Sequence, residues 1–84
     1  MPHFLVESYL AAGSRSSLAA DAARLRAAAA RVGRVRLVRS IYVPADEVCF
    51  HVLESDTAER VEDASRAAQL DFARVQSVVE LGEA

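Results

Sequence analysis

The chain has 84 residues, a formal net charge of −2 and a single cysteine. This length predicts one domain over residues 1–84, and the charge offers no general attraction to nucleic acid. One cysteine excludes an internal disulfide, and without a signal-like or long apolar stretch we expect a cytoplasmic protein with no membrane segment. Because so short a chain buries only about 60 to 65% of its unfolded surface, we also expect a homodimer.

The first predicted element is a strand over residues 2–10, where apolar side chains alternate. Phe4 and Val6 fall on one face of this strand, and His3 and Glu7 fall on the other. The second face mixes apolar and ionisable groups. That mixture is typical of a sheet surface that meets a cavity or a partner.

A helix follows, from a serine cap at Ser14 or Ser16 to about Val32, and Gly33 is expected to end it. The side chains predicted to face inward repeat at helical spacing: Leu18, Ala22, Leu25, Ala29 and Val32.

Two further strands are predicted over residues 35–43 and 47–54. Pro44 separates them, because proline fixes φ and lacks the N–H that a ladder needs. The connection is so short that the two strands must pair antiparallel. This hairpin is the strongest local signal in the chain.

The last third predicts a helix from an N-cap at Thr57 to Gln69, followed by a strand over residues 74–81. Val61, Ala64 and Ala68 are expected on the inner face of that helix, in the pattern of an amphipathic segment.

The resulting order, β-α-β-β-α-β, predicts an α+β, ferredoxin-like split sandwich. In this fold a four-stranded antiparallel sheet carries two helices on one face and leaves the other open. The topology locates a possible site between the sheet and its cover, but it does not name a reaction.

Motifs for phosphate, dinucleotide, calcium and zincin chemistry are absent from the sequence. The topology is shared with an RNA-binding module, but the basic, glycine-rich third strand of that module is missing. Arg34, Arg36 and Arg39 could hold an anion, or could be solvated arginines of an edge strand. No catalytic residue is assigned.

Six side chains remain as candidates for metal or acid–base chemistry: His3, Glu7, Cys49, His51, Glu54 and Glu80. Positions i and i+4 of a strand lie about 13 Å apart, so His3 and Glu7 cannot ligate one ion from a single strand. A site must therefore span strands, and the first and third strands are neighbours in this fold. Glu7 or His3 is expected to approach Cys49 or His51, with nickel, zinc or copper as the suited ions.

Three of these candidates also have a purely structural interpretation. A lone strand cysteine is usually a small buried hydrophobe, as Cys49 would be. His51 could be a half-buried polar residue. Glu7 could be paired with Arg39 across the sheet or from a second subunit.

Three segments resemble the nickel-responsive, ferredoxin-like protein family: PHFLVE (2–7), RSIYVPADEVCF (39–50) and AAQLDFARV (67–75). The resemblance implies a cytosolic dimer with a ferredoxin-like fold that binds nickel. The positions that match the family pattern are Glu7, Ser40, Tyr42 and Cys49. Two positions depart from it, because many relatives have histidine in place of Arg39 and Ala64.

Three functions remain open. The first is a homodimer that binds nickel or another divalent transition metal through His3, Glu7 and His51, with Arg39, Tyr42 and Cys49 as further binding residues. The second is an enzyme of the dimeric α+β barrel kind, with a cleft at the open sheet face. The third is a structural or protein-interaction module without a ligand. The sequence favours a binding protein over an enzyme.

Overall fold

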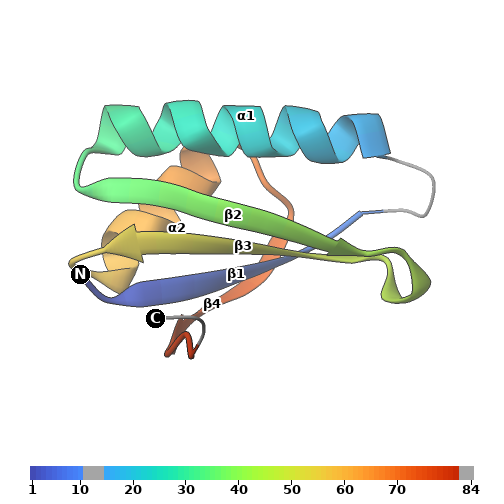
Figure 1. Ribbon diagram of the computed structural model, residues 1–84. Coiled ribbons are helices and arrows are strands. Elements are labelled where there is room, and N and C mark those ends of the chain that lie inside the picture. The colour runs from blue at the N-terminus through green and yellow to red at the C-terminus, as the bar shows by residue number, and fades with distance from the viewer. Residues whose placement is uncertain (11–14, 82–84) are drawn as a thin grey trace.

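The computed structural model describes residues 1–10 and 15–81. Its elements follow the predicted order, which Figure 1 shows along the chain. They are β1 (His3–Tyr9), α1 (Arg15–Val32), β2 (Val35–Val43), a 3-10 turn (Pro44–Asp46), β3 (Val48–Ser55), α2 (Ala58–Ala67) and β4 (Phe72–Val78).

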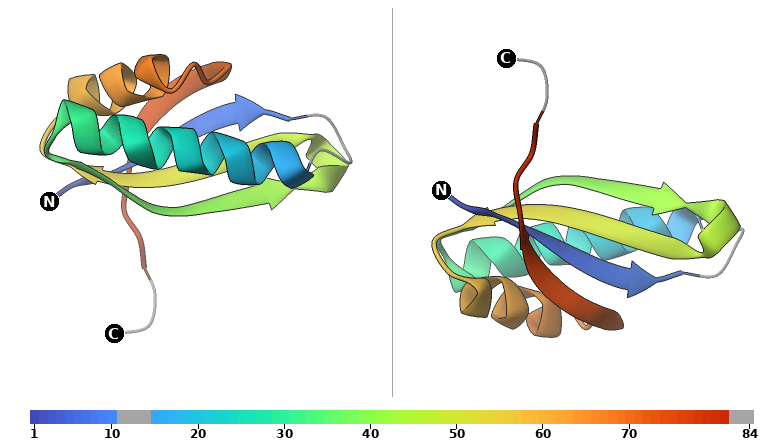
Figure 2. Two further views of the ribbon diagram at one scale, coloured as in Figure 1. Left: turned by 90° about the horizontal axis from the view of Figure 1, so that it is seen from above. Right: turned by 90° about the horizontal axis from the view of Figure 1, so that it is seen from below.

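The four strands form one antiparallel sheet in the order β2-β3-β1-β4. Both helices lie on the same face of this sheet, as Figures 1 and 2 show from the side and from above. The predicted α+β, ferredoxin-like fold is confirmed. No helix among the described residues is long and apolar enough to cross a membrane.

Local sequence signals account for the ends of both helices. After α1, Gly33 adopts a φ of +83° and its N–H donates to the carbonyl of Ala29, as expected of a glycine C-cap. Of the two proposed caps at the start of α1, Ser14 lies outside the described residues and Ser16 lies within the helix. At α2, Thr57 caps the helix as predicted.

The hairpin turn is a single 3-10 turn at Pro44–Asp46, followed by Glu47 at a φ of +52°. The N–H of Glu47 donates to the carbonyl of Pro44, at 3.2 Å. Because the backbone of Glu47 has the left-handed conformation and belongs to this turn, β3 begins at Val48, one residue later than predicted.

The last strand is shifted relative to its prediction, and runs over Phe72–Val78 instead of residues 74–81. Val78 pairs with His3, the first residue of β1, so β1 offers no partner for the residues that follow. Val79 and Leu81 are exposed. From below, this end of the chain crosses the open face of the sheet (Figure 2).

The core lies between the sheet and the helices. Leu25, Leu53, Val6 and Val61 are its largest fully buried apolar side chains. The inward positions predicted for α2 are all buried, and Leu25 and Ala29 of α1 belong to the same core. Val52 of β3 projects to the open face and is only 5% exposed, so this face is also covered in part.

Candidate functional site

The polar residues under the helices come chiefly from β3. Alternate side chains of a strand point to opposite faces, so Cys49 and His51 lie on the same face as the core residue Leu53. Both are buried, with His51 completely inaccessible to solvent and Cys49 2% exposed. A buried imidazole beside a buried thiol is the main chemical feature of this face.

Both ring nitrogens of His51 have a partner. The Nδ1 atom lies 2.6 Å from the hydroxyl oxygen of Ser40, on β2. The Nε2 atom lies 3.4 Å from Sγ of Cys49. The ring is therefore held between two neighbouring strands, with its orientation set by a hydroxyl and its other nitrogen facing sulfur.

A β-bulge brings Ser40 to this position. Leu37 pairs with Leu53, but the next paired residue of β2 is Arg39, opposite Val52, so Val38 is an extra residue. Beyond the bulge, Ser40 pairs with His51. A regular ladder would have placed Arg39 opposite His51 instead, with its charge under the helices.

Burial keeps both members of the Cys49–His51 pair in their neutral forms. It lowers the pKa of His51 from its ordinary value of 6.5, and the charge of Asp21 on α1 opposes that shift. Burial likewise raises the pKa of Cys49 from 9.0, against a hydrogen bond from Ser8. The centre therefore consists of a neutral imidazole and a protonated thiol near neutral pH, with one carboxylate close enough to act on both.

Tyr42, a predicted binding residue, lies on the same sheet face, opposite Cys49. Its hydroxyl donates to the carbonyl of Leu10, at 3.0 Å. The phenol thus ties β2 to the end of β1 next to the Cys49–His51 pair.

The other predicted residues lie on the open face. Nε2 of His3 lies 3.4 Å from Glu54 and 3.9 Å from Glu80. These carboxylates also pair with arginines of β2: Glu54 with Arg36 at 3.2 Å, and Glu80 with Arg39 at 2.9 Å. The five side chains form one ionic network, which ties the chain after β4 to the opposite edge of the sheet.

Glu7 is also on the open face, opposite Phe50 on β3. Its carboxylate accepts hydrogen bonds from Arg74 of β4, at 3.2 Å, and from the hydroxyl of Tyr9, at 3.4 Å. The partner of Glu7 is therefore Arg74, whereas the sequence suggested Arg39.

The structure does not bring the three predicted metal ligands together. His51, opposite Val6, projects toward the helices, whereas Glu7 and His3 project to the open face, opposite Phe50 and Glu54. Among residues 1–10 and 15–81, no group of three or more His, Cys, Asp or Glu side chains is arranged to hold a metal ion. What the fold does assemble is the pair Cys49 and His51.

Sequence reasoning missed two residues of this centre, Ser8 and Asp21. Neither belongs to a motif, and each comes close only through the packing of β1 and α1 around β3. Ser40 was identified only as a match to the family pattern, because its contact with His51 depends on the bulge.

No protein-family model matches the chain, and no curated protein matches it. Among solved structures, the SCO4226 protein from Streptomyces coelicolor A3(2) is similar, with a TM-score of 0.76 and 19% sequence identity. The match covers 95% of this chain and 99% of that chain. A likeness at this identity shows the fold.

Proposed function

We propose that the protein is a small homodimeric binding protein that holds a divalent transition-metal ion between Sγ of Cys49 and Nε2 of His51. The donor types fit such an ion, since thiolate and imidazole together suit zinc, nickel and copper. The resemblance to the nickel-responsive family favours nickel among these.

The observation that carries the proposal is the separation of 3.4 Å between Sγ of Cys49 and Nε2 of His51. A zinc-like ion takes sulfur at about 2.3 Å and nitrogen at about 2.0 to 2.1 Å, so a tetrahedral angle places the two donors about 3.5 Å apart. The two atoms thus already have the spacing of two ligands on one ion.

The surroundings of His51 also suit a ligand. In metal sites the second nitrogen of a ligating histidine usually has its own hydrogen-bond partner, which fixes the tautomer and the ring orientation. Ser40 is such a partner at Nδ1. Nε2 is consequently the nitrogen left for the ion.

The remaining ligands come from outside this pair. Asp21 is the carboxylate whose charge acts on both Cys49 and His51, although it is engaged in an ion pair with Arg24. His3 and Glu7 lie on the opposite sheet face and contribute nothing to the same ion within one subunit.

A second copy would cover the open face. That face carries the exposed apolar side chain of Ile41, 47% accessible, and the half-buried Leu5 and Phe50 between charged residues. Burying such a mixed surface supplies the apolar area that a chain of 84 residues lacks. Sedimentation equilibrium should give twice the chain mass, and a monomer at high concentration contradicts this part of the proposal.

Calorimetric titration of tag-free, reduced protein with nickel and with zinc tests the metal site. We expect saturable binding of one ion per chain and release of the thiol proton, so that affinity rises with pH. Co²⁺ provides a second readout, because a thiolate ligand produces a sulfur-to-metal charge-transfer absorption band.

Cys49→Ser should abolish the charge-transfer band and weaken binding at least tenfold, since the hydroxyl is a poor ligand for a soft ion. Glu7→Gln and His3→Gln are matched controls on the open face, and should leave affinity unchanged. If Cys49→Ser binds as tightly as the parent protein while either control loses affinity, the ion lies on the open face and the assignment is wrong.

A further inference from the structure

A hollow lies between α1 and the edge strand β2, in a part of the fold that the Cys49–His51 centre does not use. It has a volume of about 340 Å³ and is lined by six residues: Arg26, Ala29, Ala30, Val35, Arg36 and Leu37. Small-molecule sites begin at about 300 Å³, so this hollow is at the lower end of their range.

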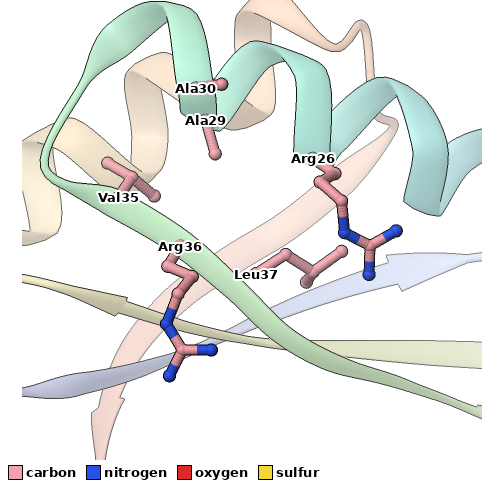
Figure 3. Close-up of a pocket in the computed structure, with 6 residues that line it drawn as sticks. All are labelled: Arg26, Ala29, Ala30, Val35, Arg36 and Leu37. Carbon is pink, nitrogen blue, oxygen red and sulfur yellow. The ribbon is translucent and has the colours of Figure 1, made fainter.

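The sequence explains why the hollow exists. Where α1 passes over β2, the helix presents Ala29 and Ala30, whose methyl groups do not fill the space above Val35 and Leu37 (Figure 3). A larger side chain on this turn of α1 would close it. The walls are consequently apolar on both the helix and the strand.

The charge at the hollow has one sign. Two of the six lining residues are arginines and none is acidic. In Figure 3 the side chain of Arg26 extends from α1 toward the level of Leu37, whereas that of Arg36 points from β2 away from α1. Apolar walls with a cationic edge are complementary to a small molecule that has an apolar body and an anionic end.

The two arginines differ in how they are engaged. Arg36 donates from Nε to Glu54, at 3.2 Å, on the open face of the sheet. Arg26 is exposed and makes no ion pair or hydrogen bond with any residue in the described part of the chain. Arg26 is therefore the cation that is available to a ligand.

We propose that this α1–β2 groove binds a small organic carboxylate with an apolar body. The apolar body lies against Ala30, Val35 and Leu37, and the carboxylate accepts hydrogen bonds from the guanidinium of Arg26. The guanidinium of Arg36 is paired with Glu54 on the open face of the sheet and takes no part in this interaction. Binding here does not need the metal site, because no lining residue is shared with it.

NMR titration of ¹⁵N-labelled protein with octanoate tests the proposal, with octan-1-ol as the neutral analogue and acetate as the bare anion. With octanoate we expect saturable chemical-shift changes of the amides of residues 29–37. Either analogue should bind with an affinity at least about tenfold lower, because each lacks one half of the interaction.

Two matched pairs of variants locate the site. Arg26→Gln should weaken octanoate about tenfold, the share of one charge-assisted hydrogen bond, whereas Arg31→Gln on the same helix should not. Ala30→Leu should fill the hollow and abolish binding, whereas Ala27→Leu, also exposed on α1, should leave it intact.

Three results would overturn the proposal: no saturable shift up to the solubility limit of octanoate, equal affinities for octanoate and octan-1-ol, or equal losses in Arg26→Gln and Arg31→Gln. Tighter binding of a glutamate pentapeptide than of octanoate, measured from chemical-shift changes of the same amides, would also overturn the proposal. It would assign the groove to an acidic protein segment. Thermal unfolding of each variant confirms that it is folded.

Discussion

The hydroxyl of Ser40 and Nδ1 of His51 lie 2.6 Å apart because the bulge at Val38 places the two residues opposite each other. The contact satisfies a nitrogen that would otherwise be buried without a partner. Among the described side chains, no buried nitrogen or oxygen lacks a hydrogen bond. The polar centre under α1 is thus a complete hydrogen-bonded group, and its members can be tested one at a time.

Ser40→Ala should lower the free energy of unfolding by about 1 to 3 kcal/mol, because it leaves Nδ1 of the fully buried His51 unsatisfied. Urea denaturation measures the change. Ser77→Ala, at an exposed position of β4, is the matched control and should stay within about 0.5 kcal/mol of the parent protein. Equal stabilities for the two variants would show that the Ser40 contact carries no energy.

Stability should fall when the pH drops below 6.5. The folded-state pKa of His51 lies below its ordinary value of 6.5, so between these two values the unfolded chain binds the extra proton and folding is penalised. The stability that comes from keeping His51 neutral is therefore fully present above pH 6.5 and is lost as the pH falls toward the folded-state pKa. Urea midpoints from pH 7 downward measure it. In His51→Gln this slope should disappear, whereas in His3→Gln it should persist.

The thiol of Cys49 affects stability at alkaline pH. The pKa of Cys49 lies above 9.0 in the folded protein, so above pH 9.0 the unfolded chain loses its proton first and stability falls as the pH rises. Cys49→Ser should flatten this alkaline slope, as measured by thermal unfolding at a series of pH values. An unchanged slope in that variant would assign the alkaline loss to another group.

Glu80→Gln should have a small and salt-dependent effect. The Arg39–Glu80 pair is partly exposed, and pairs of this kind contribute about 0.2 to 1 kcal/mol. At about 1 M salt the Debye length is about 3 Å, so the difference from the parent protein should shrink toward zero. Asp71→Asn, an exposed acid in the connection before β4, is the charge-matched control. A loss that persists in high salt would indicate that Glu80 contributes packing as well as charge.

Leu25→Ala should cost about 2 to 5 kcal/mol, because Leu25 is fully buried where α1 meets the sheet and its removal leaves a cavity. Leu81→Ala removes the same atoms from a side chain that is 93% exposed, and should change stability by less than about 0.5 kcal/mol. Urea denaturation of both variants compares them directly. A similar cost for both would mean that Leu81 is buried in solution, as a dimer contact would make it.

The sequence by itself determined the order of the elements, the hairpin turn at Pro44, the caps at Thr57 and Gly33, and the inward face of each helix. These features are decided within a few residues, by hydrophobic period, by the fixed φ of proline and by local hydrogen bonds at helix ends. The ferredoxin-like topology follows, because the handedness of the crossovers leaves few other ways to join such elements.

Only the tertiary structure decided which candidate residues meet. Glu7 and His51 belong to neighbouring strands, but a ladder alternates its faces, and a register one residue different would have put them side by side. The bulge at Val38 then selected Ser40 over Arg39 as the partner of His51. Register and bulges depend on pairing between residues that are far apart in the sequence, and local periodicity does not reveal that pairing. The surroundings of Cys49 and His51 are therefore defined only by the pairing of β2 with β3.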